Sequence, residues 1–129
     1  MKQFDKLREL LKDPKKYGVN VKKNTRVYRM LEEIAMRGIT QTGYSDKRNK
    51  YVETYGVFDA LRGAGIACKH YNNAPRGGAS GEHVELIGKV AKDVKKGFKA
   101  FATRCELSGD KKYKYSWNIE DDYLETLKK

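Results

Sequence analysis

The hydrophobic pattern of this chain changes its period at Gly65, and that change sets the class of fold. Before Gly65 the apolar residues recur at three- and four-residue spacing, as in Leu7 and Leu11, which predicts helices. After Gly65 they alternate, as in Ile66 and Cys68, which predicts strands. The sequence therefore predicts a small α+β domain in which helices are followed by two antiparallel β-hairpins.

Three helices precede the first hairpin in this prediction. The first carries Phe4, Leu7, Leu10 and Leu11 and is broken at Asp13-Pro14. The second begins at Asn24 or Thr25, buries Val27, Met30, Leu31, Ile34 and Ala35, and ends at Gly38. The third runs from Tyr51 to Ala64 with Val52, Tyr55, Phe58 and Leu61 along its buried face. The polar segment from Ile39 to Lys50 is expected to be a loop, with a brief extended piece at Ile39 to Thr42.

The two predicted hairpins enclose a further helix. The first hairpin pairs the strand around Cys68 with the strand around Val84, and its long tip is rich in glycine and carries Arg76. A helix from Gly88 to Lys96 comes next. The second hairpin would join strands at Phe98 to Leu107 and Lys112 to Ile119, and a short acidic helix capped by Asn118 would close the chain.

The last predicted strand carries aromatic residues at every second position, namely Tyr113, Tyr115 and Trp117. Strict alternation puts all three rings on one side, where they would be turned into the core. The same residues, interleaved with Lys112 and Lys114, are also typical of a surface on which unpaired bases stack. We favour the core interpretation.

The chain is long enough for one domain and short for two, so residues 1–129 are expected to fold together. The central part of this domain would span residues 24–88. Residues 89–129 would add the helix, the second hairpin and the acidic helix. Cys68 and Cys105 belong to no CxxC or Cys/His cluster, so we expect buried, reduced thiols and neither metal nor cofactor. No apolar stretch predicts a signal peptide or a membrane span, which favours a cytoplasmic protein without a membrane partner.

The charge balance indicates the partner. There are 28 Lys and Arg against 17 Asp and Glu, a net charge of +11, and such a field attracts polyanions. We expect nucleic acid, with DNA favoured over RNA. The lysines at 89, 92, 96 and 99 would follow one helical face and could track phosphates. The candidate nucleic-acid-binding residues are Lys47, Arg48, Lys50, Arg62, Lys69, Arg76, Lys89, Lys92, Lys96 and Lys99.

The order of elements from Asn24 to Gly88 resembles that of a winged helix-turn-helix domain: a helix, a possible short strand, a helix at Tyr51 to Ala64, and a hairpin with a glycine-rich tip. The resemblance implies a DNA-binding regulatory or accessory factor whose reading helix enters the major groove. It would place Lys50, Glu53, Thr54 and Arg62 on the exposed side of that helix, and Lys69 and Arg76 on the wing. The family also has a helix between the first and the reading helix, which would fall within the polar segment from Thr42 to Lys50.

Two other classes of function stay open. His70 and His83, with Glu82 nearby, could act as acid and base of a small metal-independent ribonuclease, although a protein that is not an enzyme is favoured. Alternatively, the chain could be a protein-interaction module, because its acidic C-terminal segment against a basic body could bind a basic protein or organise a homodimer. A small basic protein could equally dock on a nucleoprotein complex as an inhibitor or regulator.

Overall fold

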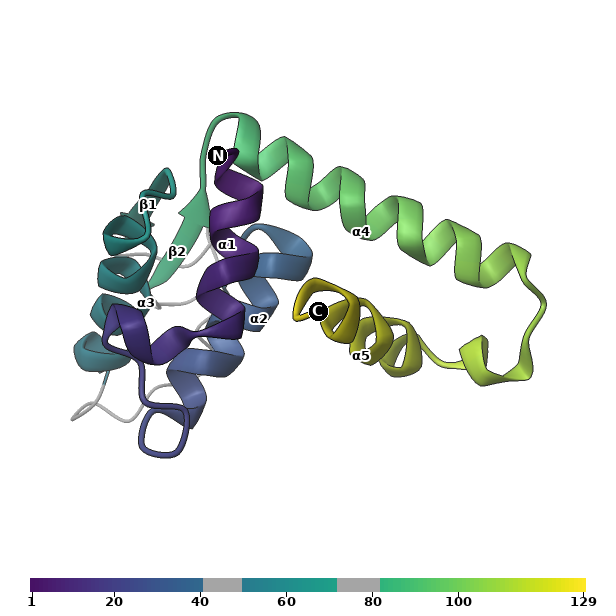
Figure 1. Cartoon of the computed structure of the whole chain (residues 1–129), viewed down its shortest axis with the longest axis horizontal. Coiled ribbons are helices and arrows are strands. Elements are labelled where there is room, and N and C mark those ends of the chain that lie inside the picture. Colours follow the sequence, from purple (N-terminus) through teal and green to yellow (C-terminus); the bar gives the residue numbers. More distant parts are fainter. Residues whose placement is uncertain (41–49, 72–81) are drawn as a thin grey trace.

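The computed structural model describes residues 1–40, 50–71 and 82–129, and it has an α+β fold (Figure 1). Three helices come first: α1 (Gln3–Lys12), α2 (Thr25–Arg37) and α3 (Lys50–Gly63), with a 3₁₀ turn, η1 (Pro14–Tyr17), between α1 and α2. Strands β1 (Cys68–Tyr71) and β2 (His83–Leu86) follow, and then α4 (Lys89–Leu107), a second 3₁₀ turn, η3 (Lys111–Lys114), and α5 (Ser116–Leu127). The predicted α+β class and the three N-terminal helices are confirmed.

The ends of the first two helices follow from their sequence. Proline cannot donate a backbone hydrogen bond, and Asp13-Pro14 ends α1 where the sequence predicted. Gly38 ends α2 in the left-handed region at φ +78°, which glycine adopts without strain, and its N–H donates to the Ile34 carbonyl at 2.8 Å. Together α1 and α2 bury a continuous apolar surface that includes Leu7, Leu10, Leu31 and Ile34.

The buried face of α3 differs from the predicted one. Val57 and Leu61 are fully buried against the core, whereas Tyr55 is 47% exposed and Phe58 is half-buried. The difference arises because Thr54, a polar residue, occupies a fully buried position on the helix. The helical spacing of α3 was therefore predicted correctly, but the face that it turns toward the core was not.

The predicted first hairpin is confirmed, with Cys68 opposite Leu86 and Tyr71 opposite His83. Its tip, at residues 72–81, lies outside the described residues. A third segment extends the sheet at β2, because the Thr40 N–H donates to the Val84 carbonyl at 2.9 Å. The Leu86 N–H likewise donates to the Gly38 carbonyl at 2.8 Å. The extended piece expected at 39–42 is therefore present at Ile39 and Thr40, and 41–42 lie outside the described residues.

The predicted second hairpin is wrong. The segment expected to be its first strand, Phe98 to Leu107, continues α4 without a break, because Phe98, Phe101 and Cys105 keep the helical spacing that begins at Val90. Gly97 does not end the helix: α4 continues through it, and the hydroxyl of Tyr123 on α5 occupies the space that a side chain at 97 would take. Figure 1 shows α4 leaving the body of the molecule and α5 returning beneath it.

The segment expected to be the second strand forms η3 and the first turn of α5 instead. With 98–107 helical, no strand is available to pair with it, and local hydrogen bonds satisfy the backbone. Asp110 accepts a hydrogen bond from the Lys112 N–H and so caps η3. Asn118 does not cap the closing helix, which begins two residues earlier, at Ser116; its amide donates back to the Lys112 carbonyl.

Tyr123 joins α4 and α5, and its hydroxyl makes no hydrogen bond with any described residue. A Cβ atom at Gly97 would lie 2.9 Å from that oxygen. We therefore expect Gly97→Ala to lack the stabilisation of about 1 kcal/mol that alanine normally gives within a helix. Tyr123→Phe should be neutral or stabilising, because it removes an unpaired buried hydroxyl.

The double variant Gly97→Ala/Tyr123→Phe should then recover the helix-propensity gain of about 1 kcal/mol. Urea unfolding of the four proteins measures this cycle. Full stabilisation by Gly97→Ala alone would contradict the close contact between α4 and α5.

Candidate nucleic-acid interface

The long helix α4 separates apolar from cationic residues on opposite faces. Val90 and Val94 are buried against the body of the protein. The opposite face carries Lys89, Lys92, Lys95, Lys96 and Lys99, all exposed, and we call these five residues the lysine face. At 1.5 Å per residue, its ends are separated by about 15 Å along the helix. This arrangement arises because the lysines keep the helical spacing through Gly97.

No residue of the lysine face forms an ion pair with a described residue. Asp93 lies within one helical turn of Lys89 and Lys96, yet no ion pair joins it to either. Four carboxylates of the described chain pair with cations on other elements. These pairs are Arg26–Glu53, Arg37–Glu120, Lys112–Asp122 and Lys128–Glu32. The lysine face therefore keeps its full charge for an external anion.

Lys95 belongs to this face and is absent from the sequence-based candidates. It follows Lys92 by three residues and precedes Lys99 by four, so the helical period alone places it there. The side chain of Lys95 passes close to Gly38. A Cβ atom added at Gly38 would lie 3.8 Å from the Lys95 Cε. The predicted helix from Gly88 to Lys96 already contains Lys95, but only the row at 89, 92, 96 and 99 was taken as its cationic face.

A second group of exposed lysines lies at the end of α1 and in the segment that leads to α2, and it comprises Lys12, Lys15, Lys16, Lys22 and Lys23. Figure 1 shows this segment at the opposite end of the molecule from α4. The two basic surfaces are thus separate. The second group provides a natural control for the first.

The structure places the remaining candidates as follows. Arg62 and Lys69 are exposed, and each cation lies over an aromatic ring: Arg62 is 5.3 Å from the Phe58 centroid and Lys69 is 5.0 Å from that of Tyr71. Lys47, Arg48, Arg76 and the side chain of Lys50 lie outside the described residues.

The exposed side of the reading helix that the winged-helix resemblance implies needs two corrections. Thr54 is fully buried, because it faces the core beside Val57. Glu53 is half-buried, and its carboxylate forms an ion pair with Arg26 of α2 at 3.0 Å, so it is not an open position for DNA. Of the residues implied for this helix whose side chains are described, Arg62 alone remains an exposed cation.

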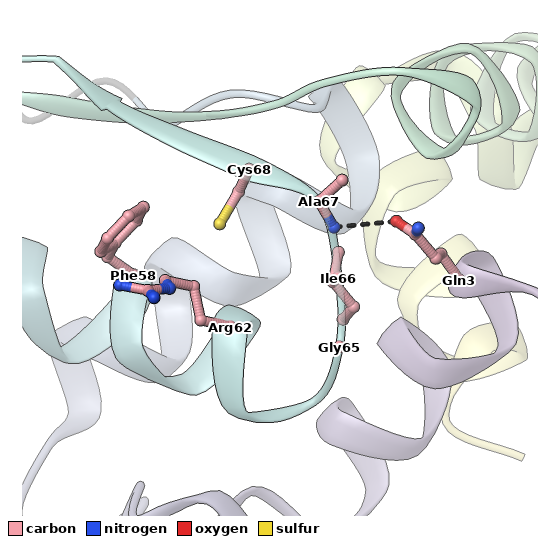
Figure 2. A pocket seen from close by; sticks show the side chains of 7 residues that line it. All are labelled: Gln3, Phe58, Arg62, Gly65, Ile66, Ala67 and Cys68. Atoms are coloured by element: carbon pink, nitrogen blue, oxygen red, sulfur yellow. Dashed lines mark hydrogen bonds between the residues drawn. The ribbon is translucent and has the colours of Figure 1, made fainter.

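Arg62 also borders an open pocket of about 370 Å³ between the start of α1, the end of α3 and β1 (Figure 2). Gln3 closes one side, since its Oε1 accepts a hydrogen bond from the Ala67 N–H at 2.8 Å. Cys68 points into the pocket from β1 (Figure 2). Burial raises the pKa of the Cys68 thiol to about 11, and the Arg62 charge opposes this only in part.

This thiol should be slow to react. Against its usual pKa of 9.0, a pKa of about 11 lowers the thiolate fraction at pH 8 about a hundredfold. In a Cys105→Ala protein, where Cys68 is the only thiol, iodoacetamide should react about a hundred times more slowly than with an unstructured cysteine peptide. The rate should keep rising about tenfold per pH unit up to pH 10, and a rate that levels off near pH 9 would contradict the buried setting of Cys68.

The histidines do not come together. His70 is opposite Val84, and His83 is opposite Tyr71, so the two imidazoles project from opposite faces of the hairpin. His70 contacts Glu82, with 3.1 Å between Nε2 and Oε2, and packs on Tyr55. His83 stacks on Tyr71 at 4.6 Å. An acid–base pair acting on one phosphate from both sides needs the two rings on one face, which this register does not provide.

Other chemical features of the described residues are few. Neither cysteine of the chain forms a disulfide; Cys105 is buried, as expected, in α4 rather than in a strand, and Cys68 is half-buried. Within the described ranges, no three His, Cys, Asp or Glu side chains are grouped so that they could hold a metal ion. None of the described helices has the length and apolar character needed to cross a bilayer.

Comparison of the chain with protein-family models, with curated proteins and with solved structures finds no match.

Proposed function

We propose that this protein binds nucleic acid through the lysine face of α4, with duplex DNA as its main ligand. The observation that carries the proposal is a row of five exposed lysines on one helix that form no ion pair with the described residues. Duplex DNA carries one negative charge per about 1.7 Å of its axis, so a row about 15 Å long can meet several phosphates at once. Release of condensed counterions then drives binding.

The order of elements supports a DNA-binding role. Helix α2, the extended residues Ile39 and Thr40, helix α3 and the β1–β2 hairpin follow one another as in a winged helix-turn-helix domain, and Thr40 pairs with β2. The remaining helix of that motif would fall at 41–49, outside the described residues. In this proposal Arg62 and Lys69 add phosphate contacts beside α3 and the hairpin, because both are exposed cations.

The proposed contacts are to phosphates, and they position a protein on DNA without reading its sequence. This suits a regulatory or accessory factor that uses its basic surface and glycine-rich wing. The cytoplasmic location expected from the sequence stays a prediction.

A salt-resolved binding panel tests the proposal. Fluorescence anisotropy with a labelled 20-base-pair duplex, at several salt concentrations between 50 and 200 mM, should give an affinity that falls with salt. Five phosphate contacts correspond to a log–log slope of about −4.5. Single-stranded DNA and RNA of equal length are measured in parallel. Failure to bind any of them at 50 mM salt, or binding that salt does not weaken, would refute the proposal.

A further inference from the structure

The turn between α4 and α5 exposes two large aromatic side chains. Tyr115 is 47% exposed and Trp117 is 57% exposed. Their rings stack on each other, with 4.4 Å between centroids and 6° between planes. The interpretation that these two residues are part of the core is therefore wrong; Tyr113 is half-buried beside them. Rings of this size are normally buried, so their exposure needs a reason.

The exposed rings belong to a well-held turn. Asp122 of α5 binds Lys112 and Tyr113 of η3 at once, with 2.7 Å to the Lys112 Nζ and 2.7 Å to the Tyr113 hydroxyl. These two hydrogen bonds lower the pKa of the Asp122 carboxyl, as expected for a carboxylate stabilised in its charged form. The Asn118 amide ties the same turn to the Lys112 carbonyl. The backbone on both sides of Tyr115 is therefore fixed, and the rings are presented in place.

The surroundings of the rings favour an anionic ligand with a planar group. The Lys114 ammonium lies 5.8 Å from the Tyr115 centroid, and both Lys114 and Lys111 are exposed without an ion pair to a described residue. Of the nearby carboxylates, Asp122 is paired with Lys112 and Glu120 with Arg37, whereas Asp121, one helical turn after Trp117, is exposed. The residues beside the rings in sequence, Lys114 and Ser116, are polar. A dry protein interface would instead need contiguous apolar neighbours.

We propose that Tyr115 and Trp117 form a stacking platform for an unpaired nucleobase, with Lys114 and Lys111 binding the adjacent phosphates. The platform lies at the start of α5, beyond the C-terminal end of α4, and the lysine face lies on the first half of α4. Each base has a π-face, so stacking tolerates any sequence and requires only that the base be unpaired. The platform rests on the proposed function and adds to it a preference for single-stranded regions.

Trp117 is the single tryptophan of the chain, so its fluorescence reports on the platform directly. Titration with a 15-nucleotide oligothymidylate should quench the emission, whereas a blunt duplex of equal length should quench it much less. Tyr115→Ala and Trp117→Ala should each weaken binding of the single strand about tenfold or more and leave duplex affinity within about twofold. Trp117→Phe should retain most of the affinity, because it keeps a ring. Circular dichroism verifies that the variants are folded.

Leu107→Ala is the matched control, because Leu107 is a large apolar side chain without a ring and is 81% exposed at the end of α4. It should leave single-strand binding unchanged. Intact single-strand binding with unquenched fluorescence, or with no loss in both ring variants, overturns the platform and leaves the proposed function standing. The rings could instead mediate an apolar contact between two copies of the chain. If the wild-type protein self-associates, and Leu107→Ala and Trp117→Ala both abolish this while oligonucleotide binding stays intact, the platform is also overturned. Failure of every nucleic acid to bind overturns both proposals.

Discussion

Replacement of Lys92, Lys96 and Lys99 together by glutamine should weaken duplex binding roughly a hundredfold at about 100 mM salt and make the log–log salt slope less steep by about three. The three side chains are exposed and form no ion pair with a described residue, so each is free to displace a counterion. Stability should change little, because no buried contact is lost. Anisotropy titrations at three or more salt concentrations measure both quantities.

The matched control removes the same charge from the other basic surface. Replacement of Lys12, Lys15 and Lys22 by glutamine should cost only a few-fold in affinity, through the weaker long-range field. Equal losses in the two triple variants would show that net charge alone governs binding. In that case the lysine face would have no special role.

Truncation of Leu61 to alanine should destabilise the protein by about 3 kcal/mol, which corresponds to a fall in Tm of roughly 10 °C. Leu61 is fully buried where α3 packs on the core, so its removal leaves a cavity as well as losing apolar burial. Thermal and urea unfolding followed by circular dichroism measure the change.

Tyr55→Ala on the same helix distinguishes the observed face of α3 from the predicted one. With 47% of Tyr55 exposed, its loss should cost about 1 kcal/mol, mainly through its contact with the His70 ring. A cost equal to that of Leu61→Ala would mean that Tyr55 lies in the core. The rotation of α3 described here would then be wrong.

The parts of the fold that the sequence predicted are those with strong local signals. Helix α2 has apolar residues at helical spacing and a terminal glycine, and the first hairpin has alternating residues on both sides of a turn-rich segment. Such patterns specify structure without long-range contacts. The rotation of α3 was missed because a buried threonine at 54 carries no apolar signal.

The C-terminal third was predicted less well because tertiary contacts decide it. Gly97 signals a helix end locally, but Tyr123 packs against it and α4 continues. The alternating aromatics at 113–117 indicate a strand locally, but they fall at the end of η3 and the start of α5, where Asp110 accepts from the Lys112 N–H and Asp122 accepts from the Tyr113 hydroxyl. Tyr123 is distant from Gly97 in sequence, so no local pattern indicates that contact.

The candidate interface was predicted only in part for the same reason. Four lysines on α4 were identified from helical spacing, and the structure adds the exposed Lys95 beside them. Pairing of the two histidines depended on the register of the hairpin, which a long tip leaves undetermined in sequence. Exposure of Tyr115 and Trp117 could not be read from alternation, because that pattern is identical for buried and exposed rings.

Lysine acetylation of the wild-type protein, with and without duplex DNA, tests most directly whether the lysine face is the contact surface. Mass spectrometry gives the reactivity of each lysine at low reagent concentration. We expect DNA to protect Lys92, Lys95, Lys96 and Lys99 several-fold while Lys12, Lys15 and Lys22 keep their reactivity. Equal protection of all these lysines, or protection confined to residues 12–23, would contradict the assignment of DNA to α4.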